Sequence, residues 1–185
     1  MTTFIRPASH WVTRWRNPAI ALCGAALITV GAKLQVPFWP VPMTLHTLAV
    51  FVIAAALGPR LGLAAMATYL GAGAMGLPVF SGSPERGVGL AYLAGPTTGY
   101  LLGYLAASGL IGWLAYGRGV MAQGAAMLAG LAVVYAAGII WLAAFVPAGQ
   151  LLAAGVLPFL AGDLVKIVLA CALLSGLHRL TGRNQ

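Results

Sequence analysis

Two opposite charges lie three residues apart in an apolar segment of membrane-spanning length. Asp163 and Lys166 occur between Pro158 and His178, and Asp163 is one of only two acidic residues in the chain. On a helix, residues three apart share one face, so this segment would present a carboxylate beside an ammonium. Each charge costs about 2.5 to 3.5 kcal/mol at the centre of a spanning helix. We therefore expect the pair to face a cavity and to bind a small polar ligand. The alternative is a self-satisfied ion pair that only holds this helix against a neighbour.

A third charge, Arg86, lies in the long external connection of the chain. If that connection folds back over the outer helix ends, its guanidinium approaches Asp163, which is within two turns of the start of the last span. An arginine can bind a carboxylate through two parallel hydrogen bonds, an aspartate accepts N–H groups, and a lysine donates to a carbonyl. A ligand with an anionic end and a urea-like or amide-like end would satisfy all three. The alternative for Arg86 is a local pair with Glu85 on an exposed loop.

Two aromatic residues are candidates for the walls of the same pocket. Trp39 and Tyr92 lie in external segments rich in proline or glycine, where a ring could cover an apolar ligand body. His46, near the outer start of the second span, is a further candidate for this space. The alternatives are an interfacial aromatic belt for the two rings and a satisfied buried histidine for His46.

Catalytic patterns are missing from the sequence. Glu85 and Asp163 are the only acids and lie far apart, and His10, His46 and His178 are scattered. The chain also lacks a nucleophile elbow of the form G-x-S-x-G and a P-loop of the form G-x-x-x-x-G-K-[ST]. We therefore expect no enzyme activity, no cofactor, no metal and no hydrolysis of ATP by this chain itself.

The composition requires a membrane. Of 185 residues, 61% are hydrophobic and 6% are charged, and the mean hydropathy is +0.96. A water-soluble core of this size cannot absorb so much apolar surface. The formal charge of +8 comes from ten basic residues spread thinly along the chain, without a basic run that would indicate nucleic-acid binding. Cys23 and Cys171 are expected to be small core residues.

We predict an all-α membrane protein with six transmembrane helices. An interfacial segment at 1–17, rich in Arg and Trp, would precede a single transmembrane domain at 18–178, followed by a tail at 179–185. A cleaved signal peptide is the alternative for the first span.

The connections between the spans also have a predicted structure. Three prolines within 36–42 predict a stiff turn, and the connection at 78–96 is too rich in Gly, Ser and Pro for a continuous helix. A short helix is expected at 150–155. The predicted spans are 18–35, 44–57, 61–77, 97–116, 121–146 and 158–178.

The distribution of basic residues predicts the orientation. With six spans both termini lie on the same side, and most arginines fall on that side: Arg6, Arg14, Arg16, Arg60, Arg118, Arg179 and Arg183. Arg86 is then the one basic residue in a loop on the opposite side. The positive-inside rule makes both termini cytoplasmic, so we expect a multi-pass protein of the cell membrane.

Four segments together resemble a known family. They are PVPMTLHTLAVFVIAAALGPRLG at 40–62, GLPVFSG at 76–82, GPTTGYLLGY at 95–104 and AGDLVK at 161–166. In this order, and in a chain of this length, they resemble the BioY family. Its members are the biotin-specific substrate-binding (S) components of energy-coupling-factor (ECF) vitamin transporters. The similarity extends over about residues 18–177.

The resemblance implies a six-helix membrane protein that captures biotin from the outer side. The family's pocket residues in the A-G-D-x-x-K stretch correspond here to Asp163 and Lys166, which would bind the ureido ring. Arg86 would bind the carboxylate, and Trp39 and Tyr92 would flank the apolar middle of the ligand.

The resemblance also implies partners. An S component docks through its first helix, where Ala21 and Ala25 match an A-x-x-x-A pattern, against a membrane T component linked to two ATPase subunits. This chain departs from the family at His46, where Gln is common. A different class of function remains open, namely an autonomous transporter of biotin or a similar small carboxylate that uses Asp163 as a proton relay.

Overall fold

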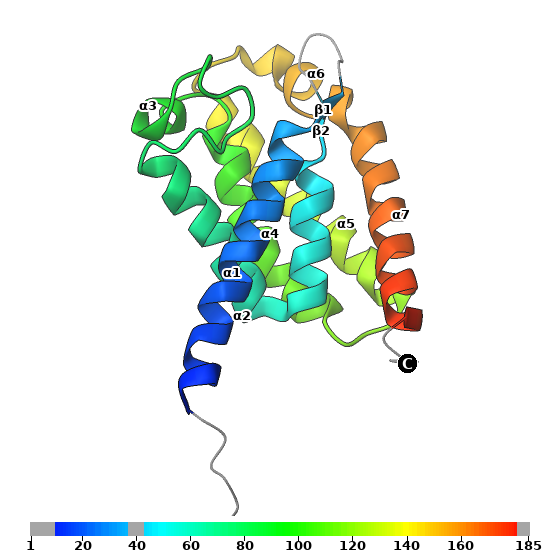
Figure 1. The fold of residues 1–185 in the computed structure, drawn as a ribbon. Helices are drawn as coiled ribbons and strands as arrows, with labels where there is room; N and C mark the ends of the chain where they lie inside the picture. The colour runs from blue at the N-terminus through cyan, green and yellow to red at the C-terminus, as the bar shows by residue number, and fades with distance from the viewer. Residues whose placement is uncertain (1–9, 37–42, 181–185) are drawn as a thin grey trace, which may run out of the picture.

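The computed structural model describes residues 10–36 and 43–180, and the chain forms a helical bundle (Figure 1). The helices are α1 (His10–Lys33), α2 (His46–Ala74), α3 (Gly89–Leu93), α4 (Thr98–Ala115), α5 (Val120–Leu142), the 3-10 helix η1 (Ala148–Gln150), α6 (Leu151–Gly155) and α7 (Leu157–Leu180). Four stretches of the described chain are long and apolar enough to cross a bilayer: His46–Ala74, Thr98–Ala115, Val120–Leu142 and Ala148–Leu177. The prediction of an all-α membrane protein is confirmed.

The helix α2 contains two of the predicted spans. Its backbone breaks at Gly58, whose φ of 80° and ψ of 178° favour glycine, and Pro59 follows. The chain descends before this break and rises after it (Figure 1). The two arms pack closely, because a Cβ added at Gly62 would lie only 2.9 Å from Cα of Ala54. Counted as two arms, α2 completes a set of six crossing segments with α1, α4, α5 and α7.

The start of α1 differs from the expectation. We predicted that Pro18 opens the first span, but α1 begins at His10 and includes Pro18. A proline inside a helix removes one hydrogen bond and crowds the preceding turn. The helix nevertheless continues through Pro18 to Lys33.

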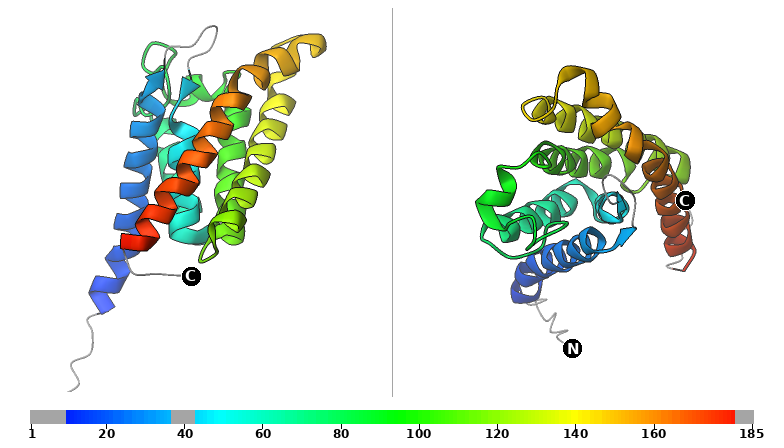
Figure 2. Two further views of the ribbon diagram at one scale, coloured as in Figure 1. Left: turned by 90° about the vertical axis from the view of Figure 1, so that its right-hand side faces the viewer. Right: turned by 90° about the horizontal axis from the view of Figure 1, so that it is seen from above.

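Glycines bring α4 close to its neighbours. A Cβ added at Gly103 would lie 2.8 Å from Cα of Val134 on α5, and one at Gly112 would lie 2.6 Å from the backbone of Gly58 on α2. At both glycines the absence of a side chain lets the backbones of neighbouring helices approach. In contrast, α7 contacts α2 and α5 more sparsely, and Figure 2 shows it on one side of the bundle.

One end of the bundle, uppermost in Figure 1, gathers the connecting segments. There, β1 (Gln35–Val36) pairs antiparallel with β2 (Met43–Thr44), a two-residue ladder that the sequence did not predict. Most of the predicted proline turn lies outside the described residues. The connection after α2 consists of turns around the short α3, so it is not a continuous helix, as expected. The predicted short helix is present as α6.

The basic side chains are unevenly distributed between the two ends. Among described residues, the start of α1, the break in α2, the α4–α5 connection and the end of α7 hold Arg16, Arg60, Arg118 and Arg179. These elements lie together at the lower end in Figure 1. Lys33 and Arg86 belong to the upper end. The asymmetry agrees with cytoplasmic termini, although the orientation itself stays a prediction.

Candidate ligand-binding site

The upper end of the bundle contains a cavity of about 280 Å³. This volume is close to the lower end, about 300 Å³, of typical small-molecule sites. The cavity is lined by residues of β2, α2, the connection around α3, α4, α5, α6 and α7. The residues that line it are Thr44, His46, Thr47, Tyr69, Ser81, Arg86, Tyr92, Pro96, Thr97, Tyr100, Leu101, Tyr104, Tyr135, Leu142, Ala154, Phe159, Asp163 and Lys166.

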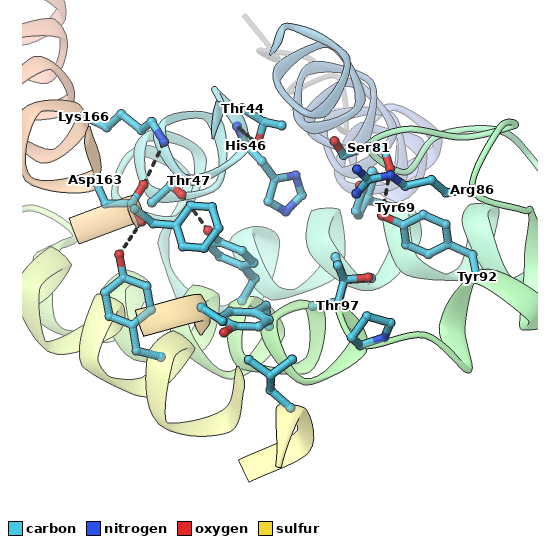
Figure 3. A pocket seen from close by; sticks show the side chains of 18 residues that line it. Thr44, His46, Thr47, Tyr69, Ser81, Arg86, Tyr92, Thr97, Asp163 and Lys166 are labelled. Carbon is cyan, nitrogen blue, oxygen red and sulfur yellow. Dashed lines mark hydrogen bonds and ion pairs between the residues drawn. The ribbon is translucent and has the colours of Figure 1, made fainter. Parts of the chain in front are cut away.

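The predicted charge pair lies in this wall, on α7. The Nζ of Lys166 is 2.8 Å from Oδ1 of Asp163, and the hydroxyl of Tyr135 donates to Oδ2 at 2.7 Å (Figure 3). Asp163 is 4% exposed and Lys166 is 7% exposed. The two groups therefore face each other, as the alternative interpretation required, and they also border a cavity, as the ligand-binding interpretation required.

The pair retains hydrogen-bonding capacity. A carboxylate offers about four acceptor positions, and an ammonium has three N–H groups. Within the described part of the chain, Asp163 accepts from two side chains and Lys166 donates to one. A ligand could thus add to the pair without breaking it.

Arg86 lies on the opposite side of the cavity from the pair (Figure 3). Its side chain is exposed and forms no ion pair with Glu85 or any other described residue. The backbone turns sharply before it, because the N–H of Arg86 donates to the carbonyl of Gly82 at 2.8 Å. Gly82 has a φ of 71°, and a Cβ there would lie 2.8 Å from Cδ of Arg86. The glycine therefore provides both the turn and the space for the guanidinium.

Tyr92 borders the cavity and supports the segment that carries Arg86. Its ring stacks on Phe80 with centroids 4.7 Å apart, and its hydroxyl donates to the carbonyl of Ser81 at 2.8 Å. Burial raises the pKa of Tyr92, which keeps this donor protonated. Trp39, the other predicted aromatic wall, lies outside the described residues.

Four tyrosines in the wall were not predicted as site residues: Tyr69, Tyr100, Tyr104 and Tyr135. Tyr135 holds Asp163, the hydroxyl of Tyr104 lies 2.6 Å from Oγ1 of Thr47, and Tyr100 donates to the carbonyl of Gly155 at 2.9 Å. One sequence signal could have found two of them: Tyr100 and Tyr104 are four apart and share a helix face. Tyr135 had no comparable neighbour.

The predicted docking residues point inward. Ala21 and Ala25 are each 6% exposed, on the face of α1 that packs against α2. A partner could not contact these methyl groups in this conformation without displacing helices. Their docking role stays a prediction that this geometry does not favour.

A membrane-spanning bundle with a ligand-sized cavity at one end, mostly apolar but bordered by charged side chains, defines a class, that of membrane-embedded small-molecule binding proteins. Among the described residues, no group of three or more His, Cys, Asp or Glu could hold a metal.

Comparison with known proteins identifies the family. The model of the BioY family matches residues 6–183, and the chain belongs to this family. It is 41% identical over 157 residues to the biotin transporter BioY of Thermotoga maritima, covering 84% of this chain and 91% of that protein. It is 36% identical over 166 residues to the biotin transporter BioY of Rhizobium etli, covering 83% and 87%.

A solved structure has the same fold. It is the 2.1 Å crystal structure of the S-component for biotin from an ECF-type ABC transporter. The superposition has a TM-score of 0.78 and covers 93% of this chain and 95% of that one, at 24% sequence identity.

Proposed function

We propose that the cavity binds biotin and that the chain is the substrate-binding S component of an ECF-type biotin uptake system. The observation that carries this proposal is the arrangement of charges. A hydrogen-bonding ion pair lies at one end of the cavity, and at the other end lies Arg86, which has no ionic partner among the described residues. Biotin is a molecule of matching polarity, with a ureido group at one end and a carboxylate at the other.

In the proposed complex, a ureido N–H donates to Asp163 and the ureido carbonyl accepts from Lys166. The carboxylate of the ligand binds the guanidinium of Arg86, whose planar shape suits two parallel hydrogen bonds. Tyr92 and Trp39 flank the apolar middle of the ligand. The pair is oriented before the ligand arrives, which reduces the entropy lost on binding.

Transport driven by ATP would need ATPase subunits outside this chain, because its sequence has no P-loop. We assign this role to a membrane T component with two ATPase subunits, by similarity to the S-component fold. The basic end of the bundle would face the cytoplasm and the cavity would open to the outer side of the cytoplasmic membrane.

Equilibrium binding of labelled biotin to the detergent-solubilised protein tests this function. The parent protein should bind biotin more tightly than biotin methyl ester, because the ester has no carboxylate to form two charge-assisted hydrogen bonds with the guanidinium of Arg86. The substitution Arg86→Met should weaken biotin binding by about tenfold or more, since a hydrogen bond to a charged group contributes about 1.5–3 kcal/mol. It should leave the affinity for the ester nearly unchanged.

Arg118→Met, at the opposite end of the bundle, is the matched control and should not alter either affinity. The proposal is wrong if the parent protein binds no biotin. The assignment of Arg86 is wrong if the variant loses affinity for biotin and for the ester equally.

A further inference from the structure

One buried polar atom of the cavity wall has no hydrogen-bond partner among the residues that the structure describes. His46 is 6% exposed, and its Nε2 is buried without a hydrogen bond in the described structure. Buried polar atoms of this kind are rare, and each requires an explanation. Because His46 also lines the cavity, a ligand is the natural partner for this nitrogen.

The packing holds the imidazole in place. Its ring lies edge-on to Tyr104, with centroids 4.7 Å apart, and tilted against Tyr69 at 5.2 Å. Tyr104 is itself held by Thr47, through a contact of 2.6 Å between their hydroxyl oxygens. The imidazole therefore has little freedom to turn away from the cavity and find another partner.

The position of His46 indicates which part of a ligand it meets. In Figure 3 the imidazole points into the cavity between the Asp163–Lys166 pair and Arg86. A biotin molecule bound as proposed above would place its ureido group at the pair and its carboxylate at Arg86. The sulfur-containing ring lies between these two ends of the ligand.

We infer that His46 donates its Nε2–H to the ring sulfur of bound biotin, and that this contact selects biotin over dethiobiotin. The inference rests on the proposed function. A thioether sulfur is a weak hydrogen-bond acceptor, and a neutral imidazole is a donor at one nitrogen. Dethiobiotin has the same ureido group and carboxylate but no sulfur, so it would leave the buried N–H unpaired. A site built around a hydrogen bond disfavours an analogue that cannot form it.

Calorimetric titration of biotin and of dethiobiotin into the purified protein tests this contact. The parent protein should bind biotin more tightly. His46→Phe keeps a planar ring against Tyr69 and Tyr104 but removes the donor. It should weaken biotin binding about three- to tenfold and leave dethiobiotin binding nearly unchanged, so that the preference is lost. His46→Gln restores an N–H donor and should restore most of the preference.

Three results would overturn the inference. They are equal affinities of the parent protein for the two ligands, an equal loss of both affinities in His46→Phe, and an unchanged preference in that variant. If His46→Phe does not fold, His46→Met is the second apolar variant, and the same outcomes apply. A parent protein that binds neither ligand would instead overturn the proposed function, so the two failures are distinguishable.

Discussion

At the scale of single residues, Asp163 is the group on which two neighbours depend. It neutralises the buried ammonium of Lys166 and accepts the hydroxyl of Tyr135. Asp163→Asn keeps the shape of the side chain but removes the negative charge. Biotin binding should weaken by about 1.5–3 kcal/mol, the range for a hydrogen bond to a charged group, as measured by equilibrium binding.

Tyr135→Phe is the matched control for this change, because it removes a hydrogen bond to the same carboxylate while leaving the ion pair intact. It should weaken binding less than Asp163→Asn. If Asp163→Asn bound biotin as tightly as the parent protein, Asp163 would not be a ligand-binding residue, and the pair would serve only to hold α7.

At the scale of elements, the end of α1 is tied to the connection that carries Arg86. The ammonium of Lys33 donates to the backbone carbonyl of Ser83 and to its hydroxyl, and Nε2 of Gln35 donates to Oγ of Ser81 at 3.3 Å. Lys33→Met should loosen this connection and let Arg86 move. We expect a several-fold loss of biotin affinity without loss of affinity for biotin methyl ester, both measured by equilibrium binding.

The control for the Lys33–Ser83 contact is Arg16→Met, which removes a charge from the opposite end of α1. It should leave biotin affinity unchanged. A parent-like affinity for biotin in Lys33→Met would show that Arg86 does not depend on α1 for its position.

The contact between α4 and α5 depends on Gly103. A Cβ at this position would meet the backbone of Val134 at 2.8 Å, whereas a Cβ at Gly176 on α7 would have no atom within 4 Å. Gly103→Ala should destabilise the protein by about 1–3 kcal/mol through overpacking. Gly176→Ala should be neutral or slightly stabilising. Thermal unfolding in detergent compares the two, and equal midpoints would show that this crossing can relax.

At the scale of the whole molecule, the sequence predicted what depends on local pattern. Hydrophobic length predicted the long helical segments, including the spans 44–57 and 61–77 that the break at Gly58 separates. The i,i+3 spacing predicted that Asp163 lies beside Lys166. Contacts between distant segments had no such signal. Two examples are the hydrogen bond from Tyr135 to Asp163 and the hydrogen bonds from Lys33 to Ser83. Both depend on how the helices pack, and no periodicity in the sequence encodes that packing.

The unpaired Nε2 of His46 likewise depends on how the helices around the cavity pack, and the sequence pattern does not predict it. The sequence could suggest that a histidine near the outer start of α2 lines the pocket or lies satisfied in the core. Only the packed structure shows that the imidazole lies between the rings of Tyr69 and Tyr104, and that its Nε2 has no hydrogen-bond partner in the described part of the chain.

The whole molecule is also expected to bind its ligand without concentrating it. Proteoliposomes that contain this chain alone should bind labelled biotin but not accumulate it, with or without a pH gradient, because the proposed S component depends on separate ATPase subunits for transport. Accumulation driven by a pH gradient alone would contradict the assignment as an S component. It would favour an autonomous transporter with Asp163 as the proton relay.

The most direct measurement is native mass spectrometry of the protein purified in detergent from cells supplied with biotin. The central claim is that two opposite charges on α7 and an arginine across the cavity together retain this one molecule. The parent protein should carry one added mass equal to that of biotin, and Asp163→Asn combined with Arg86→Met should carry none. A different retained mass in the parent protein, or biotin retained equally by the double variant, would contradict the claim.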